Sequence, residues 1–210
     1  MPAHAAAAEA ASFAAARPDE LLPLARAVGA GDPEAGATLV GAVGGGMLRV
    51  VRKVLGRGHP DIDDVTQDAV IALLSSLLTF RAECSVEHFA NRVALLTALA
   101  ARRRGRARAR QVTVEAESLD DVASDHASPL ATTVAARRRV LVRQLLDELP
   151  EVIAEALASH FILGYTVEEI AAASAVPANT VWSRLRLGKQ ALRRKLERDG
   201  ELADMLGVAT

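Results

Sequence analysis

The chain has very few aromatic residues. Its 210 residues include one Trp, one Tyr and four Phe, although half of all residues are apolar. Ala, Leu and Val must therefore form most of any core. Long alternating runs of β-branched residues are also absent, and the apolar spacing follows helices rather than strands. The sequence predicts an all-α fold.

Cysteine is almost missing as well. Cys84 is the single cysteine, which excludes a disulfide within the chain and is typical of a reducing cytoplasm. Cys84 and His88 stand one helical turn apart, but zinc takes four ligands and no second pair follows. The aspartates of 61–68 lack the glycine-turned loop of a calcium site and favour helix capping. We therefore expect no metal site.

Several function classes have no sequence signal. No apolar stretch is long enough and free enough of charge to span a bilayer, so no membrane partner is expected. Residues 1–17 are rich in Ala but lack the basic start of a signal peptide, which favours a cytoplasmic protein. The glycines at 44–46 lack the lysine and preceding strand of a phosphate-binding loop, and no nucleophile–base arrangement is present. We expect neither a cofactor nor catalysis.

Charge is balanced overall but unevenly placed. The net charge is -1, yet arginines crowd into 102–110 and 184–198. Acidic residues crowd into 61–68, 115–125 and 147–155. This segregation predicts two basic surfaces for DNA and acidic surfaces for another purpose.

The segment 166–196 has the pattern of a helix-turn-helix. Thr166 followed by Glu169 is a capping box, and Pro177 ends the first helix. The second helix begins near Ala178. Its apolar positions share one face: Val181, Leu185, Gly188, Leu192 and Leu196.

The opposite face of this second helix is polar and basic. Short polar side chains near its start suit base edges in a major groove, and the arginines behind them suit phosphates or guanine. A plain structural helix pair with a solvated face is the alternative, but cap, turn, apolar phase and charge agree on DNA binding. The residues concerned are Asn179, Ser183, Arg186, Gln190 and Arg194, with Arg184 and Lys189 on the flanks.

The chain divides into two predicted helical domains, 18–104 and 134–199. An Ala-rich extension (1–17), a flexible linker (105–133) and a tail (200–210) complete it. Helices are expected over 18–28, from the Asp32 cap to Leu55 with a kink or break at Gly44–Gly46, over 61–78 and over 86–104 in the first domain. In the second, they are expected over 140–149, with a stop at Pro150, and over 153–161, with a stop at Gly164, before the helix-turn-helix.

The helix expected over 61–78 has two usable faces. One carries Val65, Ala69, Ala72 and Leu73. The other carries Asp64, Gln67, Ile71 and Leu74 and is polar at one end and apolar at the other. Such a helix is either wholly buried or holds a partner.

With these features in place, the chain resembles bacterial RNA polymerase sigma factors of the sigma-70 family, extracytoplasmic-function (ECF) class. The resemblance covers about 20–104 and 138–197. Its motifs are Gly31-Asp32-Pro33-Glu34-Ala35, Asp63-Asp64-Val65-Thr66-Gln67-Asp68, Leu149-Pro150, Glu169-Ile170-Ala171 and Thr180-Val181-Trp182-Ser183-Arg184-Leu185. It implies a sigma factor that binds core RNA polymerase and promoter DNA, with an anti-sigma factor as a further candidate partner.

The resemblance also implies site residues. The polymerase would be held by Asp63, Asp64, Gln67, Asp68 and Ile71. The −10 DNA would meet Phe89, Arg102, Arg103, Arg104 and Arg106. The −35 element would be read by Asn179, Thr180, Trp182, Ser183, Arg184, Arg186 and Lys189, unless Trp182 belongs to the core.

Two departures from the family pattern stand out. Leu96 and Ala100 replace the Asn and Asp that the family usually has in the helix before the basic cluster, and this predicts weak −10 recognition. Asn179 stands where the family often has Gly, and Trp182 where it often has a basic residue. Two other classes remain open: a free-standing helix-turn-helix regulator, and an interaction protein that titrates an anti-sigma factor.

Overall fold

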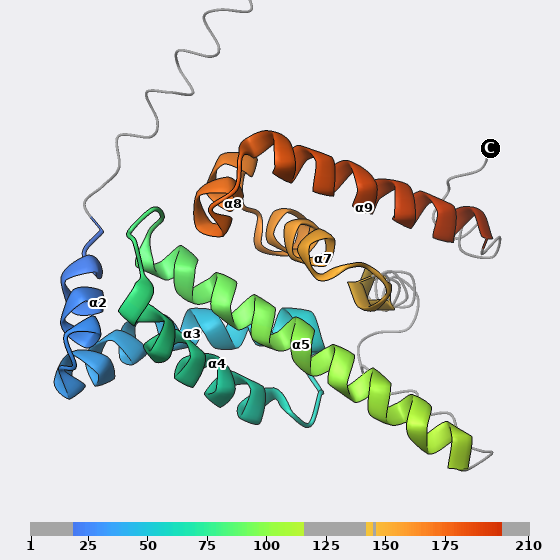
Figure 1. Ribbon diagram of the computed structural model, residues 1–210. Coiled ribbons are helices and arrows are strands. Elements are labelled where there is room, and N and C mark those ends of the chain that lie inside the picture. The colour runs from blue at the N-terminus through green and yellow to red at the C-terminus, as the bar shows by residue number, and fades with distance from the viewer. Residues whose placement is uncertain (1–18, 116–141, 145, 199–210) are drawn as a thin grey trace, which may run out of the picture.

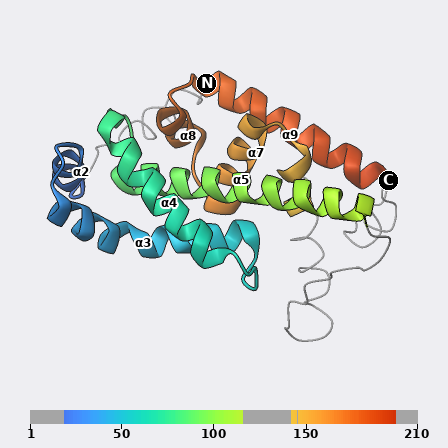
Figure 2. The ribbon, with the colours of Figure 1, turned by 60° about the horizontal axis from the view of Figure 1, so that its bottom comes forward.

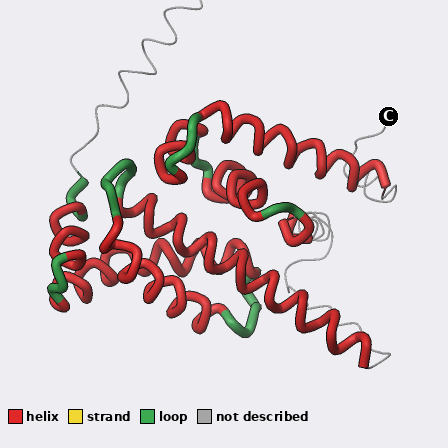
Figure 3. Tube along the Cα trace, in the orientation of Figure 1, coloured by secondary structure: helices red, strands yellow, loops and turns green. Residues whose placement is uncertain are grey.

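The computed structural model describes residues 19–115, 142–144 and 146–198. Every secondary-structure element in this part of the chain is a helix (Figure 3), as the sequence predicts. The N-terminal part consists of α2 (Leu22–Gly29), α3 (Pro33–Leu55), α4 (Ile62–Ser76), the 3-10 turn η1 (Leu77–Thr79) and α5 (Val86–Glu115). The C-terminal part consists of helical residues at 142–144 and 146–148, α7 (Glu151–Ala158), the π-helical turn η2 (Ser159–Leu163), α8 (Val167–Ser174) and α9 (Ala178–Arg198).

Helix α3 begins as the sequence predicts. The Asp32 carboxylate accepts hydrogen bonds from the backbone N–H groups of Glu34 at 2.9 Å and Ala35 at 3.2 Å, and Pro33 opens the helix. Of the two alternatives at Gly44–Gly46, the break was wrong, because α3 continues to Leu55. Buried side chains on both sides of the glycines, Val43 and Met47 among them, anchor this stretch and outweigh its poor helix propensity.

Helix α5 is longer than the sequence predicts. Its first N–H group, that of Val86, donates to the Asp19 carboxylate at 2.6 Å. It then runs past the expected end at Arg104 and on to Glu115. Gly105 does not stop it, since the surrounding Arg and Ala residues favour helix. The rest of the expected linker, 116–133, lies outside the described residues.

Helices α3, α4 and α5 pack together around the larger core. Leu39, Met47, Leu73 and Leu95 are fully or almost fully buried there. Helices α3 and α4 cover one side of α5. Helix α2 closes one end of this group, where it contacts α3 and η1 (Figure 1). Since Ala90, Ala94 and Ala98 form the buried stripe of α5, the neighbouring helices can approach closely.

The C-terminal part depends on one close approach between α7 and α9. A Cβ atom placed on Gly188 would lie 2.5 Å from Leu157 Cδ1, so only glycine fits there without repacking. Gly164, with φ 84°, ends the π-helical turn in the left-handed conformation, where the sequence places a stop.

The two parts lie against each other. Helices α7 and α8 contact α5, and α9 lies on the far side of α7 (Figures 1 and 2). The layers therefore run from α9 through α7 to α5 and then to α3 and α4. The C-terminal end of α5 extends beyond this stack (Figure 1).

Candidate nucleic-acid and polymerase interfaces

The helix-turn-helix has the predicted local structure. The Thr166 hydroxyl accepts from the Glu169 N–H at 3.2 Å, and the Glu169 carboxylate accepts from the Thr166 N–H at 2.8 Å. This reciprocal pair confirms the capping box. Ala175, with φ 52°, turns the chain in the left-handed conformation, and Pro177 lies directly before α9.

Helix α9 separates its apolar and polar faces. Val181, Leu185 and Gly188 are buried, in the predicted phase. Trp182 is 55% exposed and therefore does not belong to the core. Thr180 and Arg184 are half-buried at the edge of the exposed face, whose other predicted residues all reach solvent: Asn179, Ser183, Arg186, Lys189, Gln190 and Arg194.

The basic side chains of this face keep their charge available. Among the described residues, no carboxylate forms an ion pair with Arg184, Arg186 or Lys189. The Lys189 ammonium lies 5.4 Å from the centre of the Phe161 ring, a cation–π contact that leaves the charge in place. The face therefore offers positive charge to an anionic partner.

Helix α4 presents one exposed face from end to end. Its predicted polymerase-binding residues, Asp63, Asp64, Gln67, Asp68 and Ile71, all reach solvent. Ile71 is 56% exposed, so this face offers an apolar side chain beside its carboxylates. Ile62, Val65, Ala69 and Leu73 are buried on the opposite face, so the first of the two readings, a wholly buried helix, is excluded.

One residue of this exposed face was missed. Leu78, in η1, is 70% exposed and continues the apolar end of the face beyond Ile71. Its spacing of seven residues from Ile71 was the available signal, because residues seven apart share a helix face. Asp61 occupies the predicted N-cap position of α4 but makes no side-chain capping bond.

The residues expected to meet −10 DNA do not form one open surface. Phe89 packs its ring against Phe80, with the ring centres 4.7 Å apart. The Arg104 guanidinium lies 3.9 Å from the Asp68 carboxylate of α4. The other three arginines of this set, Arg102, Arg103 and Arg106, pair with carboxylates of the C-terminal part.

These pairs belong to a row that we call the α5 ladder, which the sequence did not predict. Its basic members lie along α5, and its acidic members lie in the 147–155 cluster noted above. The pairs are Arg92 with Glu155 at 2.6 Å, Arg103 with Glu151 at 2.8 Å, Arg102 with Asp147 at 2.6 Å and Arg106 with Glu148 at 3.6 Å. The acidic cluster thus serves α5 of the same chain.

Polar rings continue the contact toward the start of α5. The His88 and Tyr165 rings stack with centres 3.8 Å apart, and the Asn91 amide donates to the Tyr165 hydroxyl at 2.9 Å. Burial lowers the pKa of His88 and raises the pKa of Tyr165, so both groups stay neutral at pH 7. His88 is therefore engaged in packing, and the described residues contain no group of three or more potential metal ligands.

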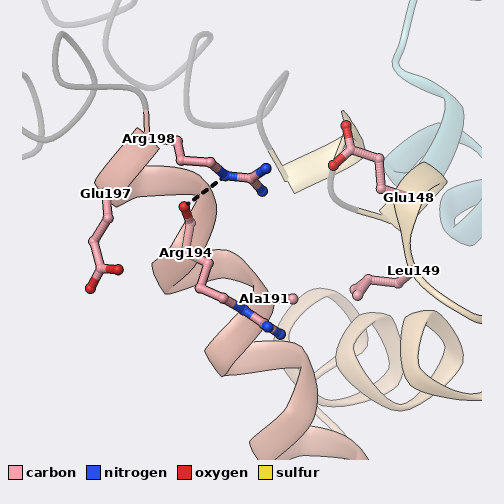
Figure 4. A pocket seen from close by; sticks show the side chains of 6 residues that line it. All are labelled: Glu148, Leu149, Ala191, Arg194, Glu197 and Arg198. Carbon is pink, nitrogen blue, oxygen red and sulfur yellow. Dashed lines mark hydrogen bonds between the residues drawn. The ribbon is translucent and has the colours of Figure 1, made fainter.

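A shallow hollow of about 510 Å³ lies at the end of α9 (Figure 4). It is lined by Glu148, Leu149, Ala191, Arg194, Glu197 and Arg198. At its edge the Lys195 ammonium donates to Glu148 at 2.7 Å, and this hydrogen bond holds the pKa of Glu148 below its usual range. Since Glu148 also meets Arg106, one carboxylate connects α9 to α5.

No described helix is both long and apolar enough to cross a membrane.

Two family models match the chain: "Sigma-70 region 2" over residues 39–109 and "Sigma-70, region 4" over residues 139–192. The chain belongs to the sigma-70 family. Region 2 thus contains most of α3, all of α4 and most of α5, and region 4 contains α7, α8 and most of α9.

Curated relatives carry sigma-factor names. The chain is 28% identical over 142 residues to the ECF RNA polymerase sigma-E factor of Escherichia coli (strain K12), which covers 65% of this chain and 74% of the relative. It is 29% identical over 165 residues to the RNA polymerase sigma-H factor of Pseudomonas aeruginosa, covering 72% and 84%. The chain is accordingly a sigma factor, which directs RNA polymerase to promoters, and the free-standing regulator is not favoured.

Solved structures are also similar. CnrH, in complex with the cytosolic domain of CnrY, has a TM-score of 0.49 and 20% identity, covering 84% of this chain and 96% of that chain. The sigma factor RpoE of Bartonella quintana, in complex with the anti-sigma factor NepR, has a TM-score of 0.47 and 18% identity, covering 77% and 96%.

Proposed function

We propose that this sigma factor holds core RNA polymerase with the exposed face of α4 and reads promoter DNA with α9. The observation that carries the proposal is the exposed Ile71 among carboxylates on α4, in a chain whose α9 carries Arg184, Arg186 and Lys189 without an ion pair among the described residues. Burying an exposed apolar side chain at an interface is favourable by about 1.5–3 kcal/mol. The surrounding charges add orientation more than affinity.

We propose a division of labour along α9. Asn179, Ser183 and Arg186 contact bases of the −35 element, because they lie on its fully exposed face. Thr180, Arg184 and Lys189 lie toward its edges and hold phosphates. Trp182 is exposed beside them and offers an apolar surface, such as a thymine methyl would meet.

The −10 element has a weaker protein partner. Leu96 and Ala100 on α5 offer no side-chain hydrogen bond, and Phe89 is engaged with Phe80. The remaining residues of the proposed set, Arg102, Arg103, Arg104 and Arg106, attract a phosphate backbone without regard to its sequence. We therefore propose that promoter choice depends mainly on the −35 element.

The proposed partners are core polymerase, promoter DNA and an anti-sigma factor. Region 4 also has exposed apolar side chains outside the DNA-binding face proposed for α9, Phe161 and Leu187 among them. These side chains support a protein partner for region 4. We propose that the chain acts in the cytoplasm and performs no catalysis of its own.

The test is reconstitution with core polymerase and run-off transcription from selected promoter DNA. Gln67→Lys combined with Ile71→Lys places two charges on the α4 face without touching the core. We expect core affinity to fall by about 100-fold or more, because an apolar contact is lost and two ammonium groups lose water. Run-off product should fall with it.

The matched control is Ala37→Lys with Ala42→Lys, which adds the same charge at exposed positions of α3. Its core affinity should equal that of the wild type. If the α4 variant is folded and still binds core polymerase normally, the proposed surface is wrong.

A further inference from the structure

We propose that Trp182 makes thymine a requirement at one position of the −35 element, because its indole ring packs on the methyl group of that base. The inference rests on the proposed DNA-reading role of α9. Trp182 lies in the second turn of this helix, next to Ser183 and one turn before Arg186, which are both proposed to contact bases.

The indole ring of Trp182 has no partner within the described part of the chain. The residue is 55% exposed, whereas its neighbours Val181 and Leu185 fill the core beneath α9. No described ring or cation stacks on it, while the exposed ring of Phe161 has the Lys189 ammonium over its face. A large apolar ring that is left in water favours a partner that covers it, and tryptophan is enriched among the residues that dominate interfaces.

A second shallow hollow, of about 290 Å³, lies beside this ring. Trp182 is the most N-terminal residue that lines it. Three cationic side chains follow at intervals of four, three and four residues, so they share one side of α9 with the ring. The hollow therefore offers apolar surface first and positive charge further along the helix. The lining residues after Trp182 are Leu185, Arg186, Lys189, Gln190 and Arg193.

The chemistry of the hollow selects its occupant. In the major groove, guanine, adenine and cytosine present hydrogen-bonding groups, whereas thymine also presents an apolar 5-methyl group. The cations on the same side of α9 suit the phosphates of the same duplex. Double-stranded DNA with a thymine beside Trp182 fits both parts of the hollow.

Replacement of thymine by deoxyuridine tests this contact without changing the protein. Deoxyuridine keeps the base pair and the O4 acceptor and removes only the methyl group. Each thymine on either strand of the −35 element of the selected promoter is replaced in turn, and the affinity of the reconstituted holoenzyme for the duplex is measured. We expect one replacement to weaken binding about fourfold, as the loss of one buried methyl-sized group would. In Trp182→Ala the same replacement should leave the affinity unchanged, because the ring that meets the methyl group is gone.

Cytosine and 5-methylcytosine at that position supply the reverse test. Methylation should tighten binding of the wild type about fourfold and leave that of Trp182→Ala unchanged. Trp182→Phe keeps an aromatic ring and should retain part of both preferences. The matched control is Val152→Ala, because Val152 is an exposed apolar residue of region 4 that lies on α7. It should distinguish thymine from uracil as the wild type does.

The fluorescence of Trp182 gives an independent measurement, because the chain has one tryptophan. Acrylamide should quench it strongly in the free full-length chain, since the ring is exposed. Saturation with the −35 duplex should remove most of this quenching. A single strand of the same sequence should leave it in place.

Three results would overturn the assignment. The first is a holoenzyme that prefers the −35 duplex but is indifferent to uracil at every thymine. The second is sensitivity to uracil that persists in Trp182→Ala. The third is protection by the single strand as strong as by the duplex, which would make Trp182 a stacking surface for unpaired bases. In all three cases the −35 preference itself survives, whereas a holoenzyme without any −35 preference would refute the proposed function of α9.

Discussion

Helices α5 and α9 carry the same kind of charge but meet different neighbours. Three of the four −10 arginines of α5 face carboxylates of region 4, whereas Arg186 and Lys189 of α9 face none among the described residues. An arginine cluster in the sequence therefore says that anions will be bound, but not which ones. Partner and position decide whether the cluster stabilises the fold or remains available to DNA.

The largest difference should appear when Arg102 is truncated. Arg102→Ala leaves the Asp147 carboxylate largely buried without its counter-charge, and this should lower the free energy of unfolding by about 3 kcal/mol. Urea unfolding followed by circular dichroism measures it. Arg108→Ala is the control, because Arg108 is exposed and outside the ladder. Equal stability of both variants would mean that the ladder contributes no more than a solvated arginine.

Truncation of an arginine on α9 should lower DNA affinity rather than stability. Arg186→Ala should weaken binding to a −35 duplex by about 2 kcal/mol, or roughly 30-fold, and relax the preference at one base pair. Stability should hardly change, because the side chain is exposed. Binding to a panel of single-base variants measures both effects. Equal weakening on every sequence would show that Arg186 holds a phosphate instead.

Substitution of two glycines tests how closely α9 and α3 pack against their neighbours. Gly188→Ala should destabilise region 4 by about 1–2 kcal/mol, because its Cβ meets Leu157. Gly45→Ala on α3 should stabilise the chain by about 0.5–1 kcal/mol, because its Cβ meets only the flexible end of Arg49 and alanine favours helix. Thermal unfolding compares them. Changes of the same sign would contradict the packing described for α7 and α9.

The smallest expected effect is on the stability of the folded chain at acidic pH. The folded chain holds the pKa of Glu148 low through Lys195, so the stabilisation is present above the ordinary glutamate pKa. It is lost as the pH falls through the lowered value. The pH dependence of unfolding should therefore be shallower in Glu148→Gln than in the wild type below about pH 4.5. Identical slopes in both proteins would exclude this coupling between α9 and α5.

Much of the structure follows from short-range signals. The Asp32 cap, the Thr166–Glu169 capping box, the stop at Gly164 and the buried phase of α9 were all predicted. Each depends on residues within a few positions of one another. Local hydrogen bonding and helix periodicity are sufficient to specify such features.

The failures share a different cause. The unbroken α3 depends on distant side chains that hold Gly44–Gly46 in a helix. The α5 ladder joins residues separated by 42 to 63 positions, and the sequence shows two charged clusters without showing that they meet. The exposure of Trp182 was left open for the same reason, since it lies beside the apolar stripe of α9. Packing between elements that lie far apart in the sequence decides all three.

The order of the ladder along the chain has a consequence for synthesis. Arg102 is made 45 residues before Asp147. At about 5–20 residues per second, the newly made arginine emerges roughly 2–9 s ahead of its counter-charge. During that interval the growing chain displays an uncovered basic helix to any nucleic acid nearby, including the ribosome's own RNA. A truncated chain ending before Asp147 would keep this affinity for nucleic acid permanently.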